Sequence, residues 1–152
     1  MKPLLIAAAL LSAATAAQAA THAAVEVMQP WSRPAAAGTN GIGYMVLVNK
    51  GAKAEVLVGV ESPAAPKIEM HSSAMSGGVM SMAREDRVTV PAGGQVTFGP
   101  GAYHLMFLGL TKALKAGDRV PATLRFASGA KVKASFTVSA GMGPPAGSSA
   151  TH

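Results

Sequence analysis

The chain has 152 residues, a formal net charge of +6 at neutral pH and no cysteine. Its 13 Lys and Arg residues are scattered, so the charge is typical of a solvated surface and does not indicate a nucleic-acid interface. Without cysteine there is no disulfide, no thiol nucleophile and no thiolate ligand for a blue-copper electron-transfer site. The sequence also lacks a Gly-x-Ser-x-Gly elbow, a phosphate-binding glycine loop and a close acid/base carboxylate pair other than the turn-like Glu85-Asp86. It therefore predicts no catalytic residues and a protein that is not an enzyme.

The first 19 residues have the pattern of a cleaved secretory signal peptide. Lys2 precedes a short apolar run, Leu4–Ala17, and Ala17-Gln18-Ala19 is a small-residue cleavage site. The run is shorter than the roughly 20 apolar residues that span a bilayer. The chain also has no cysteine to carry a lipid anchor. We therefore expect cleavage after Ala19 and a soluble, exported mature protein without a membrane anchor.

Between the two ends, the sequence is a succession of short runs rich in Val, Ile, Leu, Thr and Phe, with no segment of helical periodicity. Ten strands are predicted: Ala24–Gln29, Gly41–Val48, Glu55–Glu61, Pro66–Ser72, Val79–Ala83, Arg87–Val90, Gln95–Phe98, Tyr103–Gly109, Arg119–Phe126 and Lys131–Val138. Their spacing is typical of an all-β sandwich or barrel with antiparallel hairpins. We expect one domain over residues 20–140, followed by a disordered Gly/Pro/Ser-rich tail at 141–152.

A hairpin is predicted around residues 73–78, a small and flexible segment that contains two glycines. If its pairing is centred on Ser76 and Gly77, His71 lies directly opposite Met82. Cβ atoms of cross-strand neighbours are roughly 4.5–5.5 Å apart, so both side chains would reach one ion.

A second pair of chemically similar residues lies further along the chain. His104 and Met106 are two residues apart in the predicted strand Tyr103–Gly109, so both project from one face. With His71 and Met82 they make a set of two imidazoles and two thioethers. Copper(I) accepts both donors, whereas Zn(II) prefers thiolate, imidazole or carboxylate, and Mg(II) and Ca(II) prefer oxygen. The set predicts a Cu(I) site; the alternative is that the methionines fill the core and the histidines are packed or hydrogen-bonded.

The spacing of these four residues resembles the signature of the periplasmic copper chaperones of the PCuAC family: His, ten residues, Met, twenty-one residues, His-x-Met. His-x-Met alone is weak, since a chain with 4 His and 9 Met in 152 residues contains it by chance about 0.24 times; the two further positions lower this to about 0.0004. Other similar segments are Pro30-Trp31-Ser32-Arg33-Pro34, Val90–Gly94, Gly101–Leu110 and Leu114–Asp118, and the resemblance runs roughly from Val25 to Val138. Within it, Trp31 is expected to be buried and Arg33 to pair with a carboxylate or a backbone carbonyl.

The resemblance implies a cupredoxin-like Greek-key β-sandwich with one Cu(I) ion held by His71, Met82, His104 and Met106. It also implies a periplasmic chaperone that delivers copper to the copper centres of respiratory cytochrome oxidases, with thioredoxin-fold copper proteins as recipient partners. Two alternatives stay open. A periplasmic copper-buffering or tolerance protein would share every ligand, and a structural β-sandwich would bind no metal.

Several neighbours of the four residues are candidates for supporting roles. Met80 shares the predicted strand face of Met82, so it is a candidate to replace Met82 as a ligand or to pack beside the ligands. Met75, in the turn, is placed to shield the ion from solvent. The alternative for each is packing or simple exposure. Glu69 is a candidate to orient a ligand imidazole, whereas strand alternation turns Tyr103 away from the face of the site.

The two ends of the mature chain carry further candidate donors. A free amine with histidine third, as in Ala20-Thr21-His22, can hold Cu(II) or Ni(II) in a square-planar set of four nitrogens, so this motif is a candidate secondary Cu(II) site; the alternative is a chance histidine in an Ala-rich start. A shift of one residue in the cleavage site abolishes it. In the tail, Met142 and His152 are the only Met and His residues, which are too few donors to indicate a copper site, so a solvated terminus is the favoured interpretation.

Overall fold

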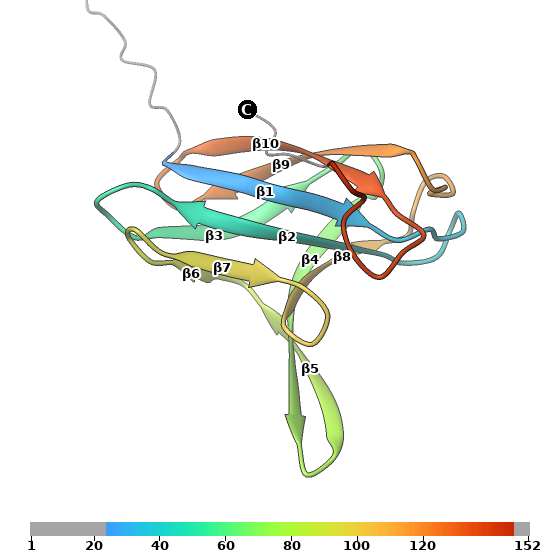
Figure 1. Cartoon of the computed structure of the whole chain (residues 1–152), viewed down its shortest axis with the longest axis horizontal. Coiled ribbons are helices and arrows are strands. Elements are labelled where there is room, and N and C mark those ends of the chain that lie inside the picture. The colour runs from blue at the N-terminus through green and yellow to red at the C-terminus, as the bar shows by residue number, and fades with distance from the viewer. Residues whose placement is uncertain (1–23, 148–152) are drawn as a thin grey trace, which may run out of the picture.

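The structure is a computed structural model that describes residues 24–147, and this part of the chain is built from ten β-strands (Figure 1). The strands are β1 Val25–Ser32, β2 Gly41–Asn49, β3 Glu55–Glu61, β4 Lys67–Ser76, β5 Val79–Glu85, β6 Val88–Val90, β7 Gln95–Phe98, β8 Tyr103–Leu108, β9 Arg119–Phe126 and β10 Lys131–Val138. All ten predicted strands are confirmed. β1 and β4 run further than predicted, to Ser32 and Ser76, and β1 does so through an irregularity between Met28 and Trp31.

The strands form one continuous hydrogen-bonded sheet that folds back on itself into two layers (Figure 1). The strand order is β5-β4-β8-β7-β2-β1-β10-β9-β3-β6, with an additional pairing of β8 with β2. β3 and β6, at one end of this order, contact β4, β2 and β7 near the other end. This arrangement is a β-sandwich, as predicted, and it puts β8 in the interior of the sheet and β5 at its edge.

The core lies between the layers and is filled by alternate residues of each strand. Its largest fully buried side chains include Phe98, Phe107, Phe136, Met45, Leu47, Leu57, Leu105 and Leu124. On β8, Leu105 and Phe107 face this core, so the residues between and beside them, His104 and Met106, project from the opposite side of the sheet. The core therefore fixes the face on which the candidate ligands lie.

Trp31 is buried as predicted, but the environment of Arg33 differs from the prediction. The ring of Trp31 packs on that of Tyr44 with centroids 4.7 Å apart, and the Arg33 guanidinium lies 5.9 Å from each ring centroid. Arg33 Nη2 donates to Met142 Sδ at 3.8 Å, and in the described part of the chain the Arg33 guanidinium has no oxygen partner and its buried Nε has no partner at all. A cation above two aromatic faces is stabilised by the rings, which replace the predicted carboxylate or carbonyl.

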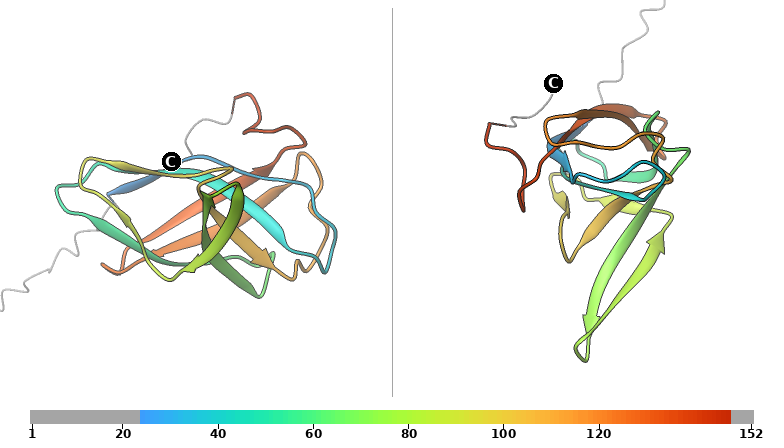
Figure 2. Two further views of the ribbon diagram at one scale, coloured as in Figure 1. Left: turned by 90° about the horizontal axis from the view of Figure 1, so that it is seen from below. Right: turned by 90° about the vertical axis from the view of Figure 1, so that its right-hand side faces the viewer.

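The β4–β5 hairpin projects well beyond the rest of the molecule (Figure 1 and Figure 2). Its turn is formed by Gly77 and Gly78, with φ of 56° and 77°, and Ser76 pairs with Val79. A two-residue turn of this kind needs positive φ at both central positions, which two glycines supply without strain. The turn is therefore one residue later than the predicted centre at Ser76 and Gly77.

Three predicted features fall wholly or partly outside the described residues. The signal peptide at 1–19 and the Ala20-Thr21-His22 motif lie wholly outside them. The predicted tail at 141–152 lies partly outside, and His152 is in the part that is not described. Within residues 24–147, no helix is long and apolar enough to cross a membrane.

Candidate metal centre

The pairing of β4 with β8 brings the two candidate histidines together. His71 and His104 are direct partners in this antiparallel register, so both side chains project from the same face of the sheet. Their ring centroids are 5.6 Å apart, with an interplanar angle of 42°. The two rings are tilted and do not stack flat on each other. The sequence predicted two separate His/Met pairs and did not show that the two histidines face each other.

His104 has an unsatisfied nitrogen in a buried position. The residue is 3% exposed, and its Nε2 has no hydrogen-bond partner among residues 24–147. Burial lowers the pKa of His104, although a hydrogen bond to the backbone of Ala102 acts in the opposite direction. A buried nitrogen without a partner costs about 1–3 kcal/mol, so it is uncommon unless a ligand satisfies it. The side chain of His104 lies on the same sheet face as that of His71.

His71 is held by a carboxylate on its own strand. Its Nε2 lies 3.0 Å from Oε2 of Glu69, two residues away on the same strand face. Glu69 also pairs with Lys67 at 2.6 Å and with Arg84 at 3.5 Å. The hydrogen bonds from Lys67 and His71 lower the pKa of Glu69 to about 2, so this carboxylate is ionised and only accepts hydrogen bonds. His71 Nε2 is then the donor of this hydrogen bond, and Nδ1 is the ring nitrogen that the bond leaves free.

Sequence reasoning left the role of Glu69 open, and its i, i+2 position beside His71 was the available signal. Tyr103 does face away from the site, as alternation predicted, and packs on Phe98 with ring centroids 5.5 Å apart.

Met106 lies beside the histidine pair. It is the direct partner of Glu69 on β4 and of Ile42 on β2, and it shares the face of His104, two residues before it. The side chain is partly buried. We call His71, His104 and Met106 the anchor of the site, because all three are held by strands β4 and β8 in the body of the sandwich.

Met82 lies further out than predicted. It pairs with Ser73, whereas His71 pairs with Arg84 on β5. The two-residue shift of register follows from the Gly77-Gly78 turn, and it keeps Met82 on the same face as His71 because strand side chains alternate with a period of two. Met82 is thus a diagonal neighbour of His71, for which Cα separations are typically about 7–8 Å. It is 60% exposed, and it belongs to the projecting segment 73–82, which we call the hairpin arm.

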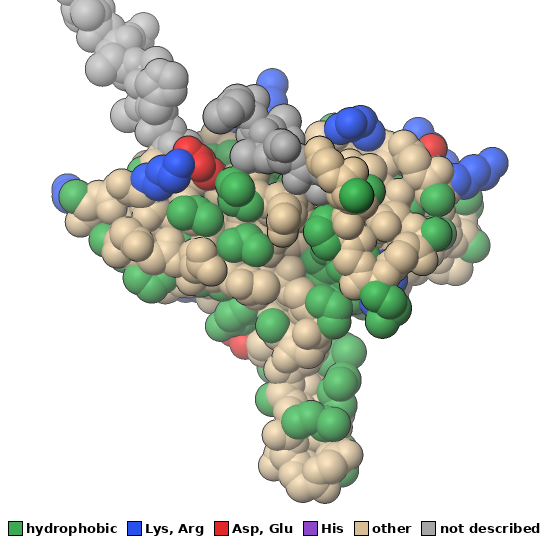
Figure 3. Space-filling view, viewed as in Figure 1, with side chains coloured by type: hydrophobic (Ala, Val, Ile, Leu, Met, Phe, Trp, Pro, Cys, Tyr) green, Lys and Arg blue, Asp and Glu red, His purple; other side chains and the backbone are tan. Residues whose placement is uncertain are grey.

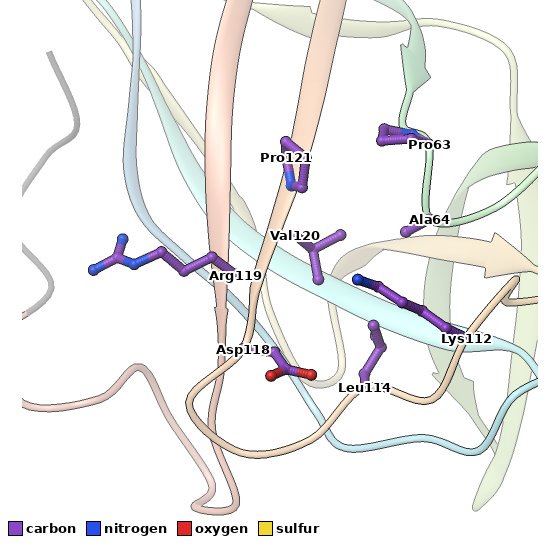
Figure 4. Close-up of a pocket in the computed structure, with 8 residues that line it drawn as sticks. All are labelled: Pro63, Ala64, Lys112, Leu114, Asp118, Arg119, Val120 and Pro121. Atoms are coloured by element: carbon purple, nitrogen blue, oxygen red, sulfur yellow. The ribbon is translucent and has the colours of Figure 1, made fainter.

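Within residues 24–147, no group of three or more His, Cys, Asp or Glu side chains is placed to hold a metal. The soft donors that share a face with the histidine pair include the thioethers of Met106 and Met82. A cavity of about 300 Å³ lies elsewhere, between the Lys112–Leu114 segment and the start of β9 (Figure 4). None of the candidate ligands lines it.

Comparisons with known proteins place the chain in a family. Residues 25–138 match the family described as "Putative lipoprotein LpqE-like". The putative lipoprotein Lxx21020 of Leifsonia xyli subsp. xyli is 30% identical over 106 residues, which cover 69% of this chain and 63% of that protein. The uncharacterized protein RP573 of Rickettsia prowazekii is 33% identical over 110 residues, 69% of this chain and 61% of that protein. The chain thus matches somewhat less than two thirds of the length of these curated relatives.

Solved structures with a similar fold are PCuAC domains and a Deinococcus radiodurans protein. The copper-bound PCuAC domain from PmoF2 superposes with a TM-score of 0.65 at 26% identity, covering 78% of this chain and 94% of that domain. The Cu(I) form of DR1885 from Deinococcus radiodurans gives a TM-score of 0.56 at 30% identity, covering 84% of this chain and 88% of that protein. Apo-DR1885 covers 93% of this chain and 96% of its own length, at 27% identity and a TM-score of 0.57. The chain belongs to the LpqE-like family, and its described residues have the cupredoxin-like β-sandwich fold of PCuAC domains.

Proposed function

We propose that this protein is a periplasmic copper chaperone that binds one Cu(I) ion through His71, Met82, His104 and Met106. The observation that carries the proposal is the buried Nε2 of His104, which has no partner and lies on the face that the imidazole of His71 shares. A soft ion bound there would satisfy a nitrogen that is otherwise a cost to the fold. The copper-bound PmoF2 domain and Cu(I)-DR1885, which share the fold, support this proposal.

Each ligand has a distinct task in this proposal. His104 Nε2 and Met106 Sδ bind the ion against the sheet, and His71 binds through Nδ1 while its Nε2–H stays donated to Glu69. A carboxylate behind a metal-binding imidazole fixes the tautomer and raises the basicity of the ligand. Met82 completes the set from the hairpin arm. None of the four ligands carries a negative charge, so the ion is released without separating opposite charges.

We further propose that the bound copper is handed to a recipient copper protein, such as the copper centre of a respiratory cytochrome oxidase or a thioredoxin-fold copper protein. Transfer requires ligands of the recipient to replace those of the donor one at a time. The exposure of Met82 favours such an exchange over closed storage, because the recipient displaces an exposed thioether without unfolding the donor. A buffering protein would share the ligands but would not transfer copper to a defined acceptor.

The test of binding is an anaerobic Cu(I) titration of the purified protein against a chromogenic competitor. We expect one tight equivalent that is lost in His104→Ala and weakened in Met82→Ala. Met142→Leu is the matched control, because Met142 is an exposed methionine outside the hairpin arm. Equal binding by His104→Ala and the wild type would refute the proposed site. Loss of copper from the loaded protein to a purified recipient then separates delivery from buffering.

We also propose that the chain is exported and cleaved after Ala19. Export with cleavage after Ala19 predicts a mature chain that begins Ala20-Thr21-His22, and intact-mass measurement of the exported protein checks it. Any other N-terminus removes the secondary Cu(II) site.

A further inference from the structure

The hairpin arm is unusual in composition and exposure. Its ten residues, 73–82, contain three methionines and no Asp, Glu, Lys or Arg. Among the described residues, the large hydrophobic side chains with the greatest exposure are Met75, Val79, Met80, Met82 and Met142, and all but the last lie on this arm. On the face seen in Figure 3, the projecting part of the molecule carries hydrophobic side chains and no charged ones.

The register of the arm gathers its three methionines on one face. Met75 and Met80 are direct cross-strand partners, so their Cβ atoms are roughly 4.5–5.5 Å apart. Met82 follows Met80 by two residues and projects from the same side, about 7 Å further along the strand. This is also the face of His71 and His104. The three thioethers therefore form a line that starts near the tip of the arm and ends beside the anchor.

Neither packing in the core nor protection of the sheet edge explains these methionines. Met75 and Met80 are 69% and 54% exposed, so they do not fill the core. β5 is the edge strand of the sheet, and edges of this kind are commonly protected by charged residues, which the arm lacks. A methionine carries a soft, uncharged sulfur, and such sulfurs select Cu(I) over the hard cations.

We propose that Met75 and Met80 form a second, weaker Cu(I) site at the tip of the hairpin arm, joined by Met82 when the anchor is empty. The inference builds on the proposed function, because it makes the tip the place where copper first arrives or last leaves. Met82 is common to both sites. The ion stays Cu(I) throughout, and Met82 remains bound during the exchange. The bonds from Met75 and Met80 break first, those from His71 and His104 form afterwards, and no electron or proton moves.

The first experiment removes the anchor and asks whether the tip still binds. The His71→Ala/His104→Ala protein is titrated anaerobically with Cu(I) against a weak chromogenic competitor. We expect one residual equivalent, weaker than that of the wild type, whose affinity falls at least tenfold when Met75→Leu and Met80→Leu are added. Met142→Leu in the same background is the control and should change nothing. The inference is overturned if the His71→Ala/His104→Ala protein binds no Cu(I), or if adding Met75→Leu and Met80→Leu leaves its residual Cu(I) affinity unchanged.

The second experiment keeps the wild-type fold intact. In the protein labelled with ¹³C at the methionine methyl groups, Ag(I) replaces Cu(I) as a soft ion that does not oxidise. We expect the first equivalent to shift the Met82 and Met106 signals and the second to shift those of Met75 and Met80. If the second equivalent leaves Met75 and Met80 unmoved, the tip site is refuted. If the first leaves Met106 unmoved, the proposed function fails, whatever the tip does.

Discussion

The anchor and the hairpin arm share one face of the sheet but differ in how firmly they are held. His104 is 3% exposed in an interior strand, whereas Met82 is 60% exposed in the edge strand. In the proposed site, the buried histidine would keep its position whether or not copper is bound, and the exposed methionine on the projecting hairpin would exchange freely. We therefore assign affinity to the anchor and release to the arm.

The largest effect is expected at the anchor. His104→Leu removes the buried nitrogen, and we predict a loss of Cu(I) affinity of more than about 100-fold, beyond the effect of changing a residue that only supports a ligand. Competitive titration measures it. The apo variant loses both the unsatisfied Nε2 and the hydrogen bond to Ala102, two opposite contributions of about 1 kcal/mol each, so its free energy of unfolding, measured by chemical denaturation, should stay nearly unchanged. An unchanged affinity would show that the anchor does not hold copper.

The carboxylate behind His71 should have the next largest effect. Glu69→Gln replaces an acceptor that fixes the His71 tautomer, so Cu(I) affinity should fall about 10- to 100-fold. Glu61→Gln is the matched control, since Glu61 pairs with Arg125 at the surface, away from the site. If Glu69→Gln and Glu61→Gln bind copper equally, the hydrogen bond between His71 and Glu69 has no role in copper binding.

A smaller effect is expected on the arm. Met82→Leu keeps the size and exposure of the side chain but removes the sulfur, and we predict about a tenfold loss of affinity, mostly through faster dissociation. Stopped-flow transfer of copper to a chelator measures the rate. If Met82→Leu weakens binding as much as His104→Leu, the distinction between anchor and arm is wrong.

The turn of the arm offers a change that touches no ligand. Gly78 has a φ of 77°, so Gly78→Val strains the hairpin by about 1–2 kcal/mol and should displace Met82. We expect a threefold to tenfold loss of affinity, at most the size predicted for Met82→Leu. Gly129→Val, at an equally left-handed position in the β9–β10 turn with φ of 89°, is the control and should lower the melting temperature without changing copper affinity. If the wild type, Gly78→Val and Gly129→Val bind copper equally, the arm is dispensable for binding.

The smallest effect is the pH dependence of the apo protein. Burial lowers the pKa of His104 from 6.5, so below about pH 6.5 the unfolded chain binds more protons than the folded one. The free energy of unfolding should therefore fall as the pH drops from about 7 towards the lowered pKa. Denaturation curves of His104→Leu should lack this fall. If the free energy of unfolding of His104→Leu falls by the same amount, a group other than His104 causes the pH dependence.

The sequence predicted the strands well because their alternation and their Gly and Pro boundaries are local properties. It missed the register of the β4–β5 hairpin by two residues, since the prediction took Ser76 as a turn residue where Gly78 fits better. The direct pairing of His71 with His104 depends on strands separated by more than thirty residues, and no local pattern determines that register. The unsatisfied nitrogen of His104 likewise arises only after the sandwich closes over it.

The most direct test of this account is X-ray absorption at the copper edge of the protein loaded with one equivalent of Cu(I). We predict a Cu(I) ion bound by two nitrogens and two sulfurs, with one sulfur lost in Met82→Leu and the nitrogen contribution reduced in His104→Leu. A site with sulfur ligands alone, or one unchanged in both variants, would contradict the division between a buried anchor and an exposed arm.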